Sequence, residues 1–203
     1  MIEKIAELFM KYGIKSLSMD DIARELGISK KTLYQHFKDK KDVVLQAVLH
    51  GVSLQSCKFK EIIEQNDFNA IDVLFFVSKQ IAENHKTINP NIHFDLQKYY
   101  PEAWQILSEH NKKHVFGKIC QNMEQGIKEG LYRDDLKINI IGKIYVQQVN
   151  NDSLVEDIGD DLSFDDILKT IFVYHMRGIA SSKGIEYLDY KLNLMEKHES
   201  NQI

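Results

Sequence analysis

The chain has 203 residues, of which 43% are hydrophobic and 28% are charged, and its net charge is −4. These values are typical of a globular protein and exclude a disordered or low-complexity chain. No apolar run approaches the roughly 20 residues that span a bilayer, and the amphipathic N-terminus resembles neither a signal nor an anchor, so we expect a cytoplasmic protein with no membrane partner.

A first amphipathic helix is predicted over residues 2–12. Ile2, Ile5, Ala6 and Phe9 recur at helical spacing, and Gly13 closes the helix. We expect this helix to form one wall of a small three-helix domain.

The next helix begins after an N-cap at Ser18. Asp21 stands at the N3 position of a capping box, and Leu17 and Ile22 occupy the positions of a hydrophobic staple. Gly27 accepts the positive φ that ends a helix. The sequence therefore predicts a short helix from Met19 to the turn at residues 26–28.

A second cap follows at Ser29 and predicts a helix over residues 30–36. Leu33 and Phe37 point inward in this helix. Its other face has no core to bury against and carries Lys31, Thr32, Tyr34 and Gln35. Two capped helices, the second basic and rich in hydrogen-bonding groups, form a helix-turn-helix that favours DNA binding over a merely solvated helix pair.

This stretch also resembles a known family. The matching positions are Ile22-Ala23, Gly27-Ile28-Ser29, Thr32-Leu33-Tyr34, His36-Phe37 and Lys40. They resemble the N-terminal domain of the tetracycline-repressor (TetR) family, over about the first quarter of the chain. The resemblance implies an all-α regulator with a helix-turn-helix domain, expected at residues 1–45, and a larger helical domain for ligand binding and dimerisation, expected at 46–203.

The distribution of charge fits a DNA-binding domain at the N-terminus. Residues 1–50 carry a balance of +2, whereas residues 51–203 carry −6. Five lysines fall within residues 30–41, as expected of a surface that contacts phosphates.

We assign roles on this surface by side-chain chemistry and by the resemblance. The predicted base contacts are Lys30, Lys31, Thr32 and Gln35, since lysine can donate to guanine, a threonine methyl suits thymine and glutamine can pair with adenine. The resemblance implies phosphate contacts at Tyr34, His36, Lys40 and Lys41. Ser18 is expected to serve both as a cap and as a phosphate donor.

Helices account for the rest of the chain. A long helix capped by Asp39 is predicted over 40–65, and others over 69–86, 91–98, 102–127, 136–150, 164–180 and 185–195, with breaks at Pro90 and Gly130 and with Pro101 in a first turn. Residues 151–163 are predicted to be a solvated connector. Their carboxylates lack the order of a calcium-binding loop.

The resemblance suggests a ligand pocket in the C-terminal domain. Pockets are mostly apolar, and the candidate lining residues are Phe94, Tyr99, Tyr100, Trp104, Phe116 and Met123. The alternative is that these residues form ordinary core.

Dimerisation is expected because two recognition helices must contact a palindromic operator about one DNA turn apart. The candidate interface is formed by two apolar stripes, Ile138, Ile141 and Tyr145 followed by Leu168, Ile171, Phe172 and His175. Each stripe could instead be internal core.

Enzyme, metal and cofactor chemistry find no support in the sequence. His110 and His114 offer a metal two ligands at most, Cys57 and Cys120 are far apart and are expected to be free thiols, and no catalytic triad or dinucleotide-binding motif occurs.

From the helix-turn-helix and the family resemblance we predict a homodimeric transcriptional regulator, a repressor released by a small-molecule effector. The alternatives are a binding module whose helix-turn-helix no longer binds DNA and a DNA-binding protein without an effector.

Overall fold

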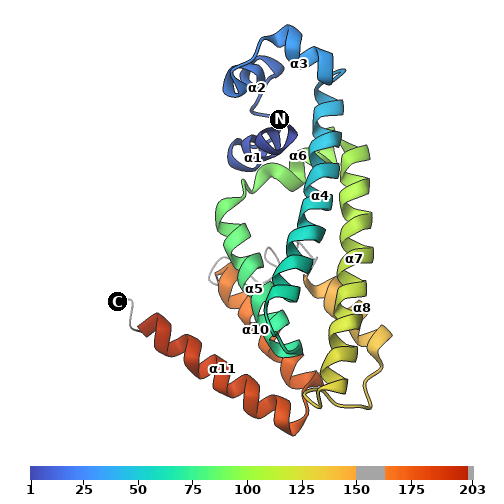
Figure 1. Cartoon of the computed structure of the whole chain (residues 1–203), viewed down its shortest axis with the longest axis vertical. Coiled ribbons are helices and arrows are strands. Elements are labelled where there is room, and N and C mark those ends of the chain that lie inside the picture. The colour runs from blue at the N-terminus through green and yellow to red at the C-terminus, as the bar shows by residue number, and fades with distance from the viewer. Residues whose placement is uncertain (150–162, 201–203) are drawn as a thin grey trace. The chain divides into compact units, whose positions relative to one another are not determined.

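The computed structural model is built of α-helices (Figure 1). It describes residues 1–149 and 163–200, with the helical backbone alone at 55–60, 64, 148–149 and 196–200. The described helices are α1 (Ile2–Tyr12), α2 (Met19–Leu26), α3 (Lys30–His36), α4 (Lys40–Gln65), α5 (Ala70–Thr87), α6 (Asn91–Tyr99), α7 (Pro101–Lys128), α8 (Ile138–Val149), α10 (Phe164–Ile179) and α11 (Ser182–Ser200). Extended pairing in the described residues is limited to an isolated bridge between Tyr132 and Ala180.

The chain divides into two compact units. Unit 1 comprises residues 1–66 and 83–113, and unit 2 comprises residues 67–82 and 114–203. The first unit therefore contains α6 and the first part of α7 in addition to α1–α4, and it extends beyond residues 1–45. The boundary at residue 45 remains a prediction about the DNA-binding domain alone.

Unit 1 has its core where α1, α2 and α3 pack on the beginning of α4. The side chains of Ile5, Ile22, Leu33 and Val43 are fully buried there. Figure 1 shows α1, α2 and α3 gathered around this end of α4, and α6 beside α1. The inward positions predicted for the first three helices are thus confirmed, since Phe9 and Phe37 are also buried.

Unit 2 has a separate core formed by α5, α7, α8, α10 and α11. It contains Ile71, Met123, Phe172 and Leu188, all buried. Two glycines allow close approaches. A Cβ on Gly126 would lie 2.0 Å from the ring of Tyr132, and a Cβ on Gly184 would lie 1.9 Å from the Leu131 carbonyl oxygen.

The predicted helices agree with the observed ones to within three residues at most ends. The last helix is longer than predicted, because it begins at Ser182 and extends to Ser200. Ser181 explains the earlier start, since its Oγ accepts a hydrogen bond from the Gly184 amide (3.1 Å) and so caps the helix. The connector predicted at 151–163 lies outside the described residues, apart from Ser163, which caps α10. Among the described residues, no helix is long and apolar enough to cross a membrane.

Candidate nucleic-acid interface

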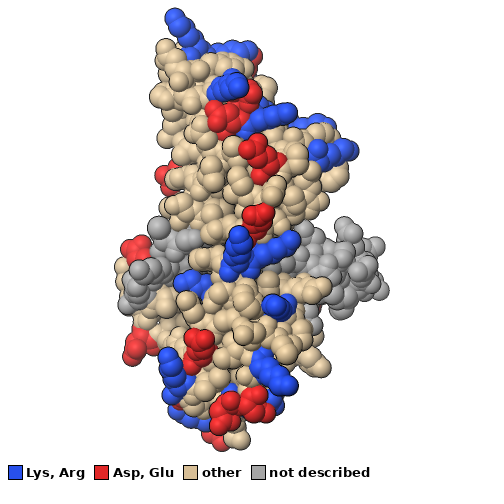
Figure 2. All heavy atoms as spheres, turned by 90° about the vertical axis from the view of Figure 1, so that its right-hand side faces the viewer, with Lys and Arg blue, Asp and Glu red and all other residues tan. Residues whose placement is uncertain are grey.

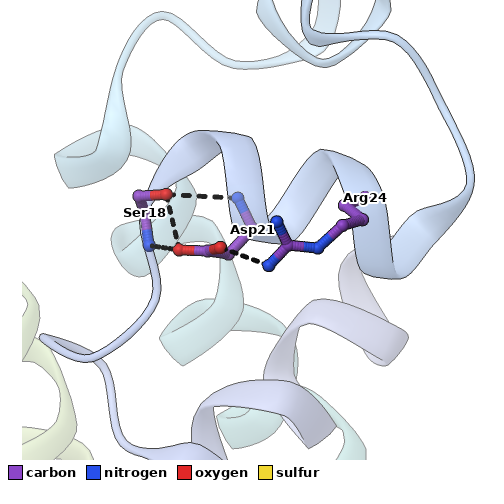
Figure 3. A network of polar contacts seen from close by, with 3 residues as sticks. All are labelled: Ser18, Asp21 and Arg24. Atoms are coloured by element: carbon purple, nitrogen blue, oxygen red, sulfur yellow. Dashed lines mark hydrogen bonds and ion pairs between the residues drawn. The ribbon is translucent and has the colours of Figure 1, made fainter.

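The beginning of α2 is fixed by a reciprocal capping box (Figure 3). The Asp21 amide donates to Ser18 Oγ (3.1 Å), and the Ser18 amide donates to Asp21 Oδ2 (2.9 Å). Arg24 forms an ion pair with the other carboxylate oxygen of Asp21. The hydrogen bonds from Ser18, followed by the Arg24 contact, lower the pKa of Asp21 from 3.8 to about 2, so the carboxylate that holds the cap stays ionised.

The turn between α2 and α3 has the predicted left-handed glycine. Gly27 adopts φ 69° and ψ 28°, a conformation that strains other residues. Ser29 then caps α3, because its Oγ accepts a hydrogen bond from the Thr32 amide (3.0 Å). The Thr32 hydroxyl lies 2.8 Å from Ser29 Oγ and is half-buried, so its hydrogen bond to the cap orients it.

The outer face of α3 is exposed. Leu33 is fully buried beneath the helix, whereas Tyr34 is 45% exposed. Lys31, Gln35 and His36 are exposed as well. A recognition helix needs a row of polar side chains that no core covers, and α3 provides one.

Charged groups surround this face. Figure 2 shows basic and acidic side chains interspersed at the top of the view, where α2 and α3 lie. Lys30 forms an ion pair with Asp20 (2.7 Å), and this hydrogen bond raises the pKa of Lys30. The ion pair with Asp20 would have to break before Lys30 could contact a base. Lys31 and Lys41 are exposed and form no ion pair among the described residues.

Lys40 lies differently from Lys41. Its Nζ donates a hydrogen bond to the Leu17 carbonyl oxygen, and its side chain is half-buried. Burial lowers the pKa of Lys40, while the nearby carboxylates of Asp95 and Asp21 act in the opposite direction. The predicted phosphate contact at Lys40 thus has an internal partner in this structure, one that joins α4 to the segment before α2. The sequence did not indicate this, because the two groups lie 23 residues apart.

The six candidate ligand residues are divided between the two units. Phe94, Tyr99, Tyr100 and Trp104 belong to unit 1, whereas Phe116 and Met123 belong to unit 2. Phe94 is 55% exposed, and Met123 is buried in the unit 2 core. A pocket lined by all six residues remains a prediction.

Three of the seven candidate interface residues are buried within the chain itself. Tyr145, Leu168 and Phe172 are buried, as the internal-core alternative predicts for those positions. The rings of His175 and Tyr145 stack with centroids 3.9 Å apart. Ile138, Ile141 and Ile171 are half-buried against the same core.

The exposed apolar groups of α8 and α10 lie beside the predicted stripes. Ile140 and Ile144 on α8 are 56% and 53% exposed, and Tyr174 on α10 is 81% exposed. These residues were not among the predicted interface positions, because α8 is apolar on more than one face. The isoleucines at positions 140 and 144, four residues apart, were the available signal.

Of the two cysteines, Cys120 has a described side chain, and it is half-buried. Burial raises the pKa of the Cys120 thiol, which disfavours the reactive thiolate. Cys57 lies among the residues whose side chains are not described. Within the described parts of the chain, no group of three or more His, Cys, Asp or Glu side chains is arranged to hold a metal ion.

Comparison with known proteins identifies the N-terminal domain. Residues 1–47 match the model of the family described as "Bacterial regulatory proteins, tetR family". This part of the chain is thus similar to the DNA-binding domain of TetR-family regulators, and it includes the capped helix-turn-helix described above. The match supports a DNA-binding regulator.

Individual TetR-family relatives extend the similarity beyond that domain. The HTH-type transcriptional repressor KstR2 of Mycobacterium tuberculosis is 24% identical over 150 residues, which cover 70% of this chain and 72% of KstR2. A transcriptional regulator of Staphylococcus aureus (strain bovine RF122 / ET3-1) is 32% identical over 115 residues, or 52% of this chain and 62% of that protein. A regulator from Saccharomonospora viridis, solved in complex with choline, has the same fold, with a TM-score of 0.69 at 18% identity over 89% of this chain and 96% of that one.

Proposed function

We propose that this protein is a homodimeric TetR-family repressor that binds a palindromic operator and leaves it when a small molecule binds the C-terminal domain. The exposed outer face of α3 carries this proposal, because it sits on a helix-turn-helix whose caps and turn are all in place. The relative KstR2 is a repressor, and the Saccharomonospora viridis regulator was solved with a small molecule. Both observations support repression relieved by an effector.

Direct contact with bases is assigned to the exposed side chains of α3. Lys31 and Gln35 are best placed for this role because neither is engaged with the core, and Thr32 can present its methyl group. Lys30 joins them once Asp20 is displaced. Tyr34, His36 and Lys41 are assigned to phosphates, and so is Ser18 at the α2 cap.

The experiment is a selection of binding sites from random duplex DNA, followed by fluorescence anisotropy with the selected operator. A sequence-specific regulator yields a palindromic consensus and binds it with an affinity that falls steeply as salt rises. Protein that recovers no consensus and binds all duplexes alike would favour the alternative that the helix-turn-helix no longer recognises an operator.

Two variants separate base contacts from phosphate contacts. Gln35→Ala is expected to weaken operator binding roughly tenfold or more and to relax the preference at one position of each half-site. Lys41→Ala is expected to weaken all duplexes equally and to reduce the salt slope by about one. Lys112→Ala on α7 is the matched control, because it removes an exposed lysine outside the helix-turn-helix.

The second copy is proposed to pack on the exposed apolar groups of α8 and α10. Ile140 and Ile144 are four residues apart on one face of α8, and Tyr174 is the most exposed large hydrophobic side chain of α10. Such a patch loses its contact with water when a second copy covers it, which favours association. Two helices from each copy would then form a four-helix bundle that sets the separation of the recognition helices.

A further inference from the structure

Unit 1 carries an open depression between the α1–α2 turn and the beginning of α6. It has a volume of about 340 Å³ and is lined by, among others, Tyr12, Lys15, Asn89, Asn91, Phe94 and Asp95. This volume lies within the range of roughly 300–1,000 Å³ that is usual for small-molecule sites. None of these residues belongs to the helix-turn-helix face that is assigned to DNA.

Hydrogen bonds donated by two backbone amides hold the two walls of the depression together. The Asn89 amide donates to the Met10 carbonyl oxygen (2.8 Å), and the Lys15 amide donates to Asp95 Oδ2 (2.9 Å). Asp95 is only 6% exposed, so its carboxylate is already engaged at the base of the depression. The site is therefore formed before any ligand arrives, which lowers the entropic cost of binding.

Two aromatic rings stand on these walls with large exposed areas. Tyr12 on α1 is 43% exposed, and Phe94 on α6 is 55% exposed. The ring of Phe94 is held edge-on to that of Tyr99, with centroids 6.4 Å apart and an interplanar angle of 82°. A planar aromatic ligand placed here would bury apolar surface that is now in contact with water.

Two side chains that line the depression, Lys15 and Asn89, offer hydrogen-bond donors. Lys15 Nζ donates to Tyr99 Oη (2.7 Å), which leaves two N–H groups without a partner among the described residues. The side-chain oxygen of Asn89 accepts a hydrogen bond from the Asn91 amide (3.0 Å), so its NH₂ group remains to donate. Lys98 adds a second ammonium 5.1 Å from the centre of the Phe94 ring.

We propose that this depression is a binding site for a small aromatic carboxylate. The ring would lie against Phe94 and Tyr12, and the carboxylate would accept hydrogen bonds from Lys15 Nζ and from the side-chain NH₂ group of Asn89. This site differs from the six-residue effector pocket expected in the C-terminal domain: the two share only Phe94, and half of the residues that line the depression come from positions 12–16. Because its walls are the segment that leads into α2 and the beginning of α6, a bound acid stiffens the connection between them.

The test uses full-length protein and 1-naphthoate, whose fluorescence reports binding. Lys15→Ala and Phe94→Ala are each expected to weaken naphthoate binding at least tenfold, whereas Lys112→Ala leaves it unchanged. Hydrogen exchange with saturating naphthoate is expected to slow at residues 12–16 and 89–95. The neutral 1-naphthamide should bind at least tenfold more weakly, since a hydrogen bond to a charged group is worth about 1.5–3 kcal/mol.

Three results would overturn the proposal. One is naphthoate binding that neither Lys15→Ala nor Phe94→Ala weakens. Another is slowed exchange confined to unit 2, which contains none of the residues that line the depression. The third is tighter binding of 1-naphthylmethylammonium than of naphthoate, which would show that Asp95 selects cations. Thermal unfolding of each variant identifies any loss of binding that comes from misfolding, and in that case Lys15→Gln and Phe94→Leu replace the affected variants.

Discussion

Ser18 and Asp21 determine where α2 begins through two hydrogen bonds between neighbours three residues apart. Replacing a serine cap by alanine typically costs about 1 kcal/mol. We therefore expect Ser18→Ala to lower the free energy of unfolding by about that amount, as measured by urea denaturation. Ser53→Ala on α4 is the control, because it removes an exposed serine from a helix interior and should not destabilise.

The same cap makes the stability of the folded protein depend on pH, and the lowered pKa of Asp21 determines the direction. The pKa of Asp21 is lowered from 3.8 to about 2, so the folded state binds this proton less readily than the unfolded state. The stability from the capped carboxylate is complete above pH 3.8 and is lost as the pH falls towards about 2. The stability difference between wild type and Asp21→Asn should therefore shrink over that interval. A difference that stays constant from pH 5 to pH 2 would contradict this cause.

Helix α7 contains two glycines with opposite expected effects. A Cβ at Gly126 would lie 2.0 Å from the Tyr132 ring, whose hydroxyl donates to the buried Asn122 (3.1 Å) and so resists movement. Overpacking of this kind costs about 1–3 kcal/mol, so Gly126→Ala should destabilise by that amount or more. Gly117 has nothing within 4 Å of its Cβ position, and Gly117→Ala should stabilise the helix by roughly 0.5–1 kcal/mol. Chemical denaturation of the two variants measures whether each free energy of unfolding changes in the expected direction.

The packing of α8 against α10 buries an imidazole. His175 stacks on Tyr145, and its Nε2 has no hydrogen-bond partner in the described structure. Burial lowers the pKa of His175 from 6.5 to about 4. An unfolded chain binds this proton more readily, so stability contributed by the neutral imidazole should be lost as the pH falls from 6.5 towards 4.

His175→Phe tests this, because the phenyl ring keeps the stack and cannot take a proton. Between pH 7 and pH 5, wild type should lose more unfolding free energy than His175→Phe does. His36→Gln, which removes an exposed histidine, should follow wild type. Equal losses in wild type and His175→Phe would show that this histidine does not set the acid sensitivity.

Assembly of two copies is tested on the exposed patch of α8 and α10. Ile144→Lys, at a side chain that is 53% exposed, should shift the protein from dimer to monomer in analytical ultracentrifugation without loss of helical circular dichroism. A buried, unpaired lysine in an apolar interface is costly. Leu49→Lys is the control, because Leu49 is 47% exposed but lies on α4 in unit 1. A dimer that survives Ile144→Lys would place the interface elsewhere.

The sequence by itself determined the helix-turn-helix, because its signals act over three or four residues. The Ser18 and Ser29 caps, the left-handed Gly27 and the inward Leu33 depend on local backbone geometry, and the structure confirms each of them. Most helix boundaries follow for the same reason, since the apolar period and the breakers at Gly13 and Gly130 are local. The caps at Ser163 and Ser181 were not among the predictions.

Only the tertiary structure decided which side chains are available for function. The hydrogen bond from Lys40 to the Leu17 carbonyl oxygen and the burial of Tyr145 arise between segments far apart in the chain. Periodicity shows that a helix has an apolar face, but it cannot show which neighbour covers that face. For this reason Ile140 and Ile144 were found only once α8 was packed. The depression between residues 12–16 and 89–95 depends on contacts that no local pattern encodes.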